Sequence, residues 1–197
     1  YIPSINRITY DTISSITHQG VAPYYDLHVP GYENYLANGI WNHNTGKSYF
    51  ALYLAVLIGG SWIHNHLTAE PGKVLYLDYE TDQYEVDERI KAIVAGLSVE
   101  AVPEIYYRFC AGALPHEVED IQAFITENQI DVVVVDPLGG AVGADMNDSE
   151  PILDYFRALR TLRSTTGLSV TSLSIDHTNK EGRLFGSEYK FHRARSV

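Results

Sequence analysis

Continuous apolar runs alternate with segments of helical periodicity from residue 45 onward, and this alternation constrains the fold more than any other feature. Apolar runs without polar alternation predict strands buried on both faces, as in parallel sheets covered by helices. The predicted strands span residues 73–77, 105–110, 130–135 and 168–175. Apolar residues at helical spacing predict a helix after Ser48 that ends at Gly59-Gly60, and others over 86–94, 118–124 and 153–162. This order predicts an α/β fold built from βαβ units.

Residues 1–44 have a different pattern. Short bursts of alternating apolar and polar residues, such as Tyr25–Val29, are broken by turn residues that include Pro30, Gly31 and Asn38-Gly39. This pattern indicates short strands joined by turns. The sequence therefore predicts a small all-β segment, 1–44, followed by an α/β domain, 45–197.

Composition limits the classes of partner. The formal net charge of −11 argues against a chain whose whole surface binds nucleic acid. The basic cluster at 190–195 is either a local binding patch or a solvated strand end. The sequence has no long apolar span and no signal peptide pattern, so we expect a cytoplasmic protein with no membrane partner. Its single cysteine, Cys110, is expected in the core. The start without Met, and an end at Arg195-Ser196-Val197 with the pattern of a strand interior, lead us to expect a fragment of a longer protein.

The residues Thr45-Gly46-Lys47-Ser48 match the end of the phosphate-binding loop pattern GxxxxGK[S/T]. In such a loop, backbone N–H groups and a helix N-terminus bind phosphates, the lysine reaches the β and γ oxygens, and the hydroxyl residue holds Mg²⁺. Asp136 ends the predicted strand 130–135, where a carboxylate can join the Mg²⁺ shell. We therefore expect ATP on residues 45–48, and Mg²⁺ on Ser48 and Asp136.

The first half of this loop departs from the pattern. Its first glycine should stand five residues before Gly46, and that position is Trp41. A non-glycine residue there opposes the positive φ angles and the close backbone approach that phosphate binding requires. We therefore expect the chain as written to bind ATP poorly.

The residues before Thr45 resemble the two C-terminal splicing blocks of inteins. The resemblance rests on 25–31, on 34–40, and on the pair His43-Asn44 directly before a hydroxyl residue. It implies that Asn44 cyclises to a succinimide and cuts the chain, and that Thr45 is the nucleophile after the junction. It also implies that His43 donates a proton or stabilises the carbonyl oxygen, and that Asp26 couples the steps.

Two departures qualify this resemblance. Glu33 stands where the family often has a histidine, and the N-terminal splicing blocks are absent from the 197 residues. Splicing therefore requires an N-terminal intein half as partner, encoded upstream or supplied in trans. The alternative is that 1–44 is a small β-rich domain in which Asn42-His43-Asn44 forms an ordinary turn.

Residues 45–197 resemble RecA-like ATPases of the replicative-helicase and plasmid-replication type. The resemblance rests on 74–80, on Asp136-Pro137-Leu138, on 145–148 and on Asp176-His177. It implies a three-layer sandwich, with Glu80 as the general base of ATP hydrolysis and His177 as γ-phosphate sensor. It further implies a hexamer-like homo-oligomer, single-stranded DNA as partner, and a bacterial or phage origin. Glu80 could instead be an exposed loop acid, and His177 a surface histidine.

These expectations combine into one hypothesis with two alternatives. The chain is a precursor fragment in which splicing removes 1–44 and restores the phosphate-binding loop of a DNA-replication ATPase. One alternative is an unspliced nucleotide-binding module whose N-terminal β segment binds a partner. The other is an inactive fragment.

Overall fold

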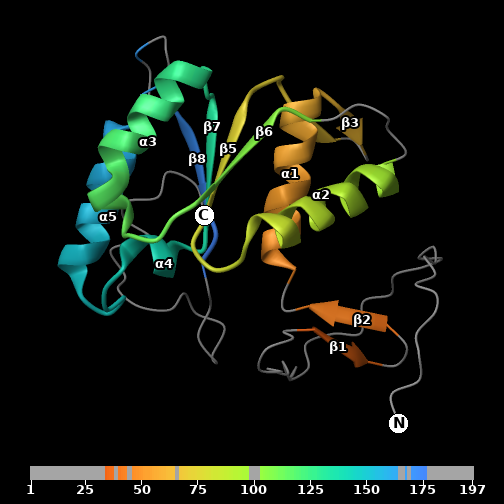
Figure 1. The fold of residues 1–197 in the computed structure, drawn as a ribbon, viewed down its shortest axis with the longest axis horizontal. Coiled ribbons are helices and arrows are strands. Elements are labelled where there is room, and N and C mark those ends of the chain that lie inside the picture. The colour runs from red at the N-terminus through yellow and green to blue at the C-terminus, as the bar shows by residue number, and fades with distance from the viewer. Residues whose placement is uncertain are drawn as a thin grey trace. The chain divides into compact units, whose positions relative to one another are not determined.

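The computed structural model describes residues 34–37, 40–43, 46–64, 67–97, 103–163, 167 and 170–176. The chain divides into two compact units, Tyr1–Asn44 and Thr45–Val197. Figure 1 shows the elements of each unit. In the first unit, β1 (Asn34–Ala37) pairs antiparallel with β2 (Ile40–His43), with Leu36 opposite Trp41.

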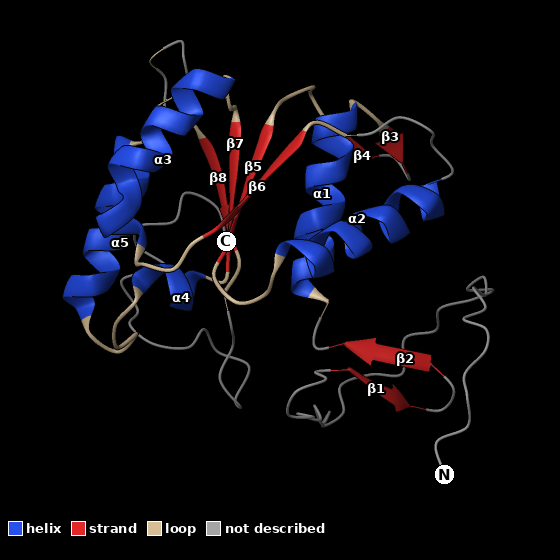
Figure 2. Cartoon of the chain, viewed as in Figure 1, coloured by secondary structure: helices blue, strands red, loops and turns tan. Residues whose placement is uncertain are grey.

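The second unit is built on a four-stranded parallel sheet in the order β6-β5-β7-β8. Figure 2 shows these strands side by side between two groups of helices. The strands are β5 (Val74–Asp78), β6 (Ile105–Phe109), β7 (Val132–Asp136) and β8 (Thr171–Ser174). Two short strands, β3 (Ile63–His64) and β4 (Leu67–Thr68), pair with each other outside this sheet.

Helices cover both faces of the sheet (Figure 1). One face carries α1 (Lys47–Gly60) and α2 (Gln83–Leu97). The other carries α3 (Leu114–Asn128), α4 (Leu138–Val142) and α5 (Ser149–Thr161). Side chains alternate along each strand, so Tyr76 packs in the α1 and α2 core while Leu75 and Leu77 pack in the α3 and α5 core.

The predicted α/β class is confirmed, and each predicted strand and helix of the second unit is present within a few residues. Cys110 is 3% exposed at the end of β6, as expected, and burial raises the pKa of its thiol. The assignment of residues 1–44 to an all-β intein fold stays a prediction, since only β1 and β2 of that unit are described. Among the described residues, no helix has both the length and the apolar character needed to cross a bilayer.

The structure differs from the prediction in three details. The β3–β4 pair and α4 were not predicted, because elements of two to five residues are too short for a periodic pattern. The fully buried side of α5 is formed by Ile152 and Tyr155, whereas Leu153 and Phe156 are half-buried. Sequence periodicity predicted a face of Leu153, Phe156, Leu159 and Leu162; Leu159 and Leu162 are buried as predicted, and the first half of the helix buries Ile152 and Tyr155 more fully than Leu153 and Phe156.

Candidate functional site

The first turn of α1 has the features of an anion-binding helix start. Gly46 caps the helix with φ of 72°, a left-handed conformation that favours glycine, and no acidic residue lies in the first turn. Among the described residues that are not its chain neighbours, none has a side-chain atom within 4 Å of where a Cβ on Gly46 would stand, so the φ angle of Gly46 is what favours glycine there. Lys47 and Ser48 are half-buried in this turn. The unpaired N–H groups at a helix start carry partial positive charge and favour phosphate.

The segment before this turn is not a phosphate-binding loop. Trp41, at the position of the first glycine, lies in β2 and pairs with Leu36 of β1. Its backbone is therefore part of an antiparallel ladder that belongs to the first unit. The residues present fit the second half of a nucleotide phosphate site and do not fit the first half.

Two buried carboxylates lie side by side where β5 and β7 end. Asp78 and Asp136 are neighbours in the parallel register and are 2% and 6% exposed. The carboxyl ends of parallel strands form the edge at which α/β proteins bind ligands. The Tyr76 hydroxyl donates a hydrogen bond to Oδ2 of Asp136 and fixes the orientation of this carboxylate. Burial, followed by the charge of Asp136, raises the pKa of Tyr76, so the phenol remains a donor.

Asp78 holds the turn that carries Glu80. Its Oδ1 accepts the backbone N–H groups of Glu80 at 3.0 Å and Thr81 at 2.9 Å. Its Oδ2 accepts the hydroxyls of Thr81 at 2.5 Å and Tyr107 at 3.0 Å. These four donors stabilise the buried charge of Asp78, so this carboxylate has a structural role. The side chain of Glu80 is exposed, two residues after the end of β5. Burial, then the charge of Asp78, raises the pKa of Tyr107.

A buried arginine, Arg89, links the two helices on this face of the sheet. Its side chain is 5% exposed, forms an ion pair with Glu85 on α2, and lies 5.3 Å from the ring centre of Tyr49 on α1. Its positive charge also lowers the pKa of Tyr76, although burial and Asp136 outweigh that effect. Sequence reasoning missed both Asp78 and Arg89. The Asp78 role has a local signal, since aspartate followed by a turn often binds its own backbone, whereas Arg89 has no such signal.

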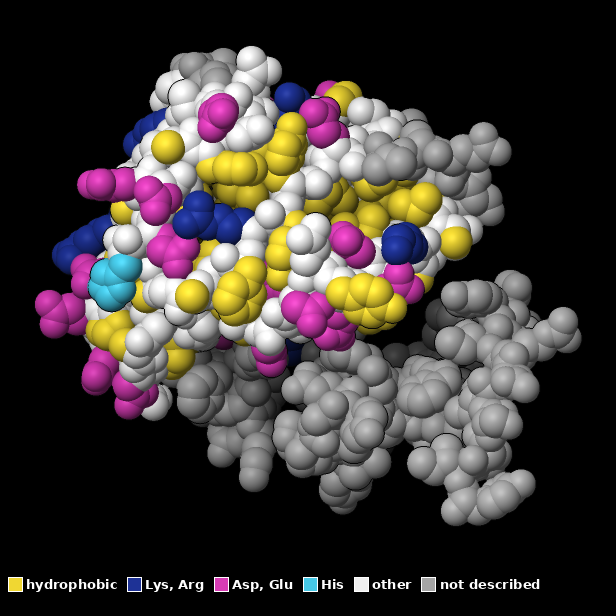
Figure 3. Space-filling model, viewed as in Figure 1, with side chains coloured by type: hydrophobic (Ala, Val, Ile, Leu, Met, Phe, Trp, Pro, Cys, Tyr) yellow, Lys and Arg dark blue, Asp and Glu magenta, His cyan; other side chains and the backbone are white. Residues whose placement is uncertain are grey.

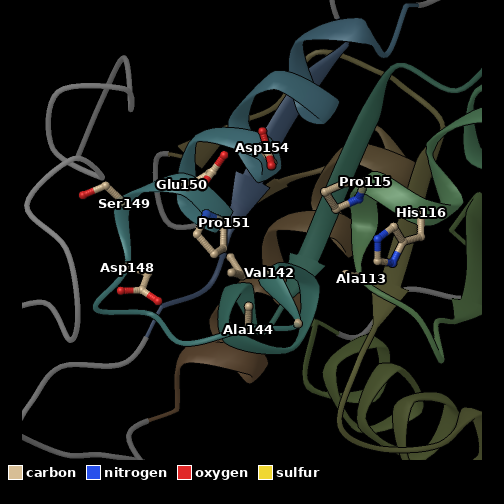
Figure 4. Close-up of a pocket in the computed structure, with 11 residues that line it drawn as sticks. Ala113, Pro115, His116, Val142, Ala144, Asp148, Ser149, Glu150, Pro151 and Asp154 are labelled. Carbon is tan, nitrogen blue, oxygen red and sulfur yellow. The ribbon is translucent and has the colours of Figure 1, made fainter.

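A separate pocket of about 620 Å³ lies in the layer of α3, α4 and α5 (Figure 4). His116 of α3 lines one side, Glu150 and Asp154 of α5 line the other, and Val142 of α4 lies between them. None of the described residues predicted to bind ATP or Mg²⁺ lines this pocket. We therefore place the candidate site at the ends of β5 and β7 and the start of α1.

The structure describes some of the predicted site residues and not others. Gly46, Lys47 and Ser48 start α1, Asp136 ends β7, and Glu80 follows β5. His43 is the last residue of β2, and its side chain is not described. The remaining predicted residues lie outside the described part of the chain: Asp26, Asn44, Thr45 and His177.

Comparison with known proteins agrees with this geometry. A family model described as an AAA domain matches residues 37–183, which is well over half of the chain. The matched range contains Gly46, Lys47, Glu80 and Asp136, and it begins inside the first unit. A search of curated protein sequences found no match. The parallel sheet, the helix start with Gly46-Lys47-Ser48 and the family match agree, and the chain belongs to the AAA-domain family of P-loop ATPases.

Proposed function

We propose that the chain is the precursor of an ATP-hydrolysing domain and that residues 1–44 are the C-terminal segment of an intein. The observation that carries this proposal is the position of Trp41. It stands where the first glycine of the phosphate-binding loop belongs, yet it lies in a strand of a separate unit. That unit ends at Asn44, directly before Thr45-Gly46-Lys47-Ser48.

The proposed splicing step joins a new segment to Thr45. The Thr45 hydroxyl oxygen attacks the activated acyl group at the upstream junction, so that a new ester forms and the upstream intein residue leaves. The side-chain amide nitrogen of Asn44 then attacks its own backbone carbonyl, which closes a succinimide and breaks the Asn44–Thr45 bond. His43 gives a proton to the departing amine of Thr45. That amine finally displaces the ester oxygen, and a peptide bond replaces the ester.

The joined segment would supply the missing Gly-x-x-x of the loop. We assign phosphate binding to residues 45–48, Mg²⁺ binding to Ser48 and Asp136, and activation of the attacking water to Glu80. His177 is proposed as the γ-phosphate sensor. Because the described residues fit only half of the phosphate site, we derive no hydrolysis step for the chain before splicing.

Mass spectrometry tests the splicing proposal directly. The purified chain is mixed with an N-terminal intein half whose preceding segment ends in Gly-x-x-x. We expect a ligated product that starts upstream and continues at Thr45, together with a free peptide that ends in a succinimide. The Asn44→Ala variant should stop at the branched ester, and Thr45→Ala should give no ligation. The absence of both ligation and cleavage with every compatible half would refute the proposal.

A second candidate function is an intact nucleotide-binding module, favoured by the family match that begins within the first unit at residue 37. Calorimetric titration of MgATP into the Asn44→Ala chain separates the two candidates. Our proposal expects weak binding before ligation and at least a tenfold gain in affinity in the ligated product. Tight binding to the unprocessed chain would favour the second candidate.

The finer assignment, a helicase-type ATPase of DNA replication, rests on the resemblance of the second unit alone. It proposes a hexamer-like assembly of the ligated product, stimulation by single-stranded DNA, and action in the bacterial cytoplasm of a protein that a bacterium or its phage encodes. Sedimentation of the ligated product with and without a single-stranded oligonucleotide tests the assembly.

A further inference from the structure

Helix α5 and strand β8 are joined by a buried pair of hydroxyl groups. The hydroxyl oxygen of Tyr155 on α5 lies 2.6 Å from that of Ser174, the last residue of β8. Tyr155 is 0% exposed, and the apolar side chains of Ile152 and Leu159 belong to the same core cluster. A polar group in such a layer carries a desolvation cost unless it is hydrogen-bonded. Ser174 is therefore the partner that makes a tyrosine acceptable at this position.

Packing alone does not account for the tyrosine. Phenylalanine would fill the same space, and replacing both partners of a buried hydrogen bond by apolar groups of the same shape costs little stability. A hydrogen bond differs from an apolar contact because it restricts both the distance and the direction between two atoms. The hydroxyls of Tyr155 and Ser174 thus fix the end of β8 relative to α5 more narrowly than an apolar contact would.

The end of β8 is held by contacts from β7, α4 and α5. Ile175 N–H donates to Val135 O on β7 at 2.9 Å, and Leu138 N–H at the start of α4 donates to Ile175 O at 2.7 Å. These two bonds restrain the backbone. The hydroxyl pair adds a side-chain restraint one residue earlier, at the point where β8 reaches the carboxyl edge of the sheet.

The residues after Ser174 lead to the candidate site. They are Ile175, Asp176 and then His177, the proposed γ-phosphate sensor. Asp176 is half-buried. Burial raises the pKa of Tyr155 and the charge of Asp176 raises it further, so this carboxylate also acts on the phenol. A displacement of the end of β8 is therefore passed to the sensor within three residues.

We propose that Tyr155 is a positioning residue for ATP hydrolysis: through its hydrogen bond with Ser174 it fixes the end of β8, and with it the sensor His177. Tyr155 acts through its partner and does not itself touch ATP. The inference rests on the proposed function for the role of the sensor. Its test has one part that requires ATP hydrolysis and one that does not, so the two proposals can fail separately.

The expected effect is on turnover and not on ATP binding. Phosphate binding is assigned to residues 45–48 at the start of α1, and α1 packs on the opposite face of the sheet from α5. A catalytic group displaced by about 1 Å can slow a reaction by up to about a hundredfold, even when the mutation is far from the reacting atoms. Loss of the hydroxyl pair should therefore lower kcat and leave the KM for ATP nearly constant.

Steady-state kinetics of the ligated product measure this effect. Tyr155→Phe keeps the ring and its edge contact with Phe156 and removes only the hydroxyl. We expect kcat to fall about tenfold, with the KM for ATP changed by less than about twofold. Tyr106→Phe is the control, because it removes a hydroxyl whose contact with Glu104 is exposed, and its kcat should stay constant. An unchanged kcat in Tyr155→Phe would overturn the inference.

A double variant separates positioning from stability. In Tyr155→Phe the Ser174 hydroxyl loses its partner, so the urea midpoint should fall. Tyr155→Phe combined with Ser174→Ala removes both polar groups, and the midpoint should return toward its original value. The hydrogen bond is still absent, so kcat should remain low. If kcat recovers together with the midpoint, the pair has a purely structural role and the inference is overturned.

Amide hydrogen exchange tests the inference without ATP hydrolysis, in the full chain carrying Asn44→Ala. In Tyr155→Phe, the amide of Ile175 should exchange about tenfold faster, because the end of β8 opens more often. The amide of Cys110, which donates to Asp78 O at 2.8 Å at the same edge of the sheet, should be unaffected. Unchanged exchange at Ile175, or equal acceleration at both amides, would overturn the inference. If the ligated product hydrolyses no ATP, the proposed function fails and this exchange experiment decides the inference alone.

Discussion

At the scale of single residues, the candidate site depends on two carboxylates that each accept a hydrogen bond from a tyrosine distant in the sequence. Asp78 accepts a hydrogen bond from Tyr107, 29 residues away, and Asp136 accepts one from Tyr76, 60 residues away. Buried charges are stable only when such donors surround them. The tyrosines therefore fix the two carboxylates, and Asp78 in turn fixes the backbone on which Glu80 stands.

Substitution of Tyr107 tests this arrangement. Tyr107→Phe removes one donor from the buried Asp78 carboxylate, and we expect the free energy of unfolding to fall by about 1–2 kcal/mol. Urea denaturation followed by circular dichroism measures the change. Tyr106→Phe is the control on the same strand, because that hydroxyl makes only an exposed contact of 3.4 Å with Glu104. Equal losses in both variants would contradict the role assigned to Tyr107.

At the scale of elements, α4 directly follows β7 in the chain and packs against the turn that follows β5. A Cβ on Gly140 would stand 2.5 Å from Cβ of Tyr79, next to Glu80 in sequence, so this contact requires glycine. On Gly139 of the same helix, a Cβ would meet no atom within 4 Å from the described residues beyond its own turn of helix. The close approach of α4 thus limits where the Glu80 turn can lie.

A pair of alanine variants tests that limit. Gly140→Ala should displace Tyr79 and lower the free energy of unfolding by about 1–3 kcal/mol, because the clash involves a side-chain stem that is close to the backbone. Gly139→Ala should leave stability unchanged or raise it slightly, since alanine favours helix. Thermal unfolding compares the two. A destabilised Gly139→Ala variant together with an unaffected Gly140→Ala variant would contradict the packing described.

The sequence predicted those elements whose length exceeds one period of their pattern. Four apolar runs became the four strands of the parallel sheet, and four periodic segments became the four long helices. The predicted strands also placed Asp136 and Glu80 correctly in the fold. Asp136 ends β7, and Glu80 stands two residues after the end of β5. The turn-holding role of Asp78 was missed although it has a local signal, since its donors include the backbone of Glu80 and Thr81. The burial of Arg89 could not be predicted, because it depends on neighbours brought together by folding. The burial of Tyr155 could not be predicted either, because its hydroxyl is paired with the hydroxyl of Ser174 on β8, at 2.6 Å and 19 residues away.

At the scale of the whole molecule, acidic residues outnumber basic ones, and the formal net charge is −11. Figure 3 shows acidic side chains spread over the visible face of the described residues, with fewer Lys and Arg side chains among the hydrophobic and uncharged ones. Nucleic acid would therefore meet a mostly repulsive surface on this face. Contact with single-stranded DNA, as proposed, requires a restricted basic region.

Stability of the molecule should decrease in alkaline solution. Burial raises the pKa values of Tyr76 and Tyr155 above the ordinary tyrosine value of about 10. Below pH 10 both phenols are protonated in the folded and unfolded states. As pH rises above 10, only the unfolded state loses these protons, so the free energy of unfolding falls by up to about 1.4 kcal/mol per pH unit for each.

Urea midpoints at pH 9, 10 and 11, combined with absorbance of ionised tyrosine at 295 nm, check this expectation. The absorbance increase from Tyr76 and Tyr155 should appear only when the chain unfolds, because both phenols stay protonated in the folded state. Tyr155→Phe should reduce the slope of stability with pH. Full ionisation of all tyrosines in a chain that keeps its native circular dichroism would contradict the prediction.

The position of β8 also matters for aggregation of the chain. Its neighbour β7 contains four consecutive valines, Val132–Val135, and would expose an apolar strand edge if nothing paired with it. Such an edge recruits strands from other molecules. β8 covers it with a strand of threonine, serine and leucine whose first two side chains are exposed to solvent. β8 thereby protects this edge of β7 from pairing with strands of other molecules.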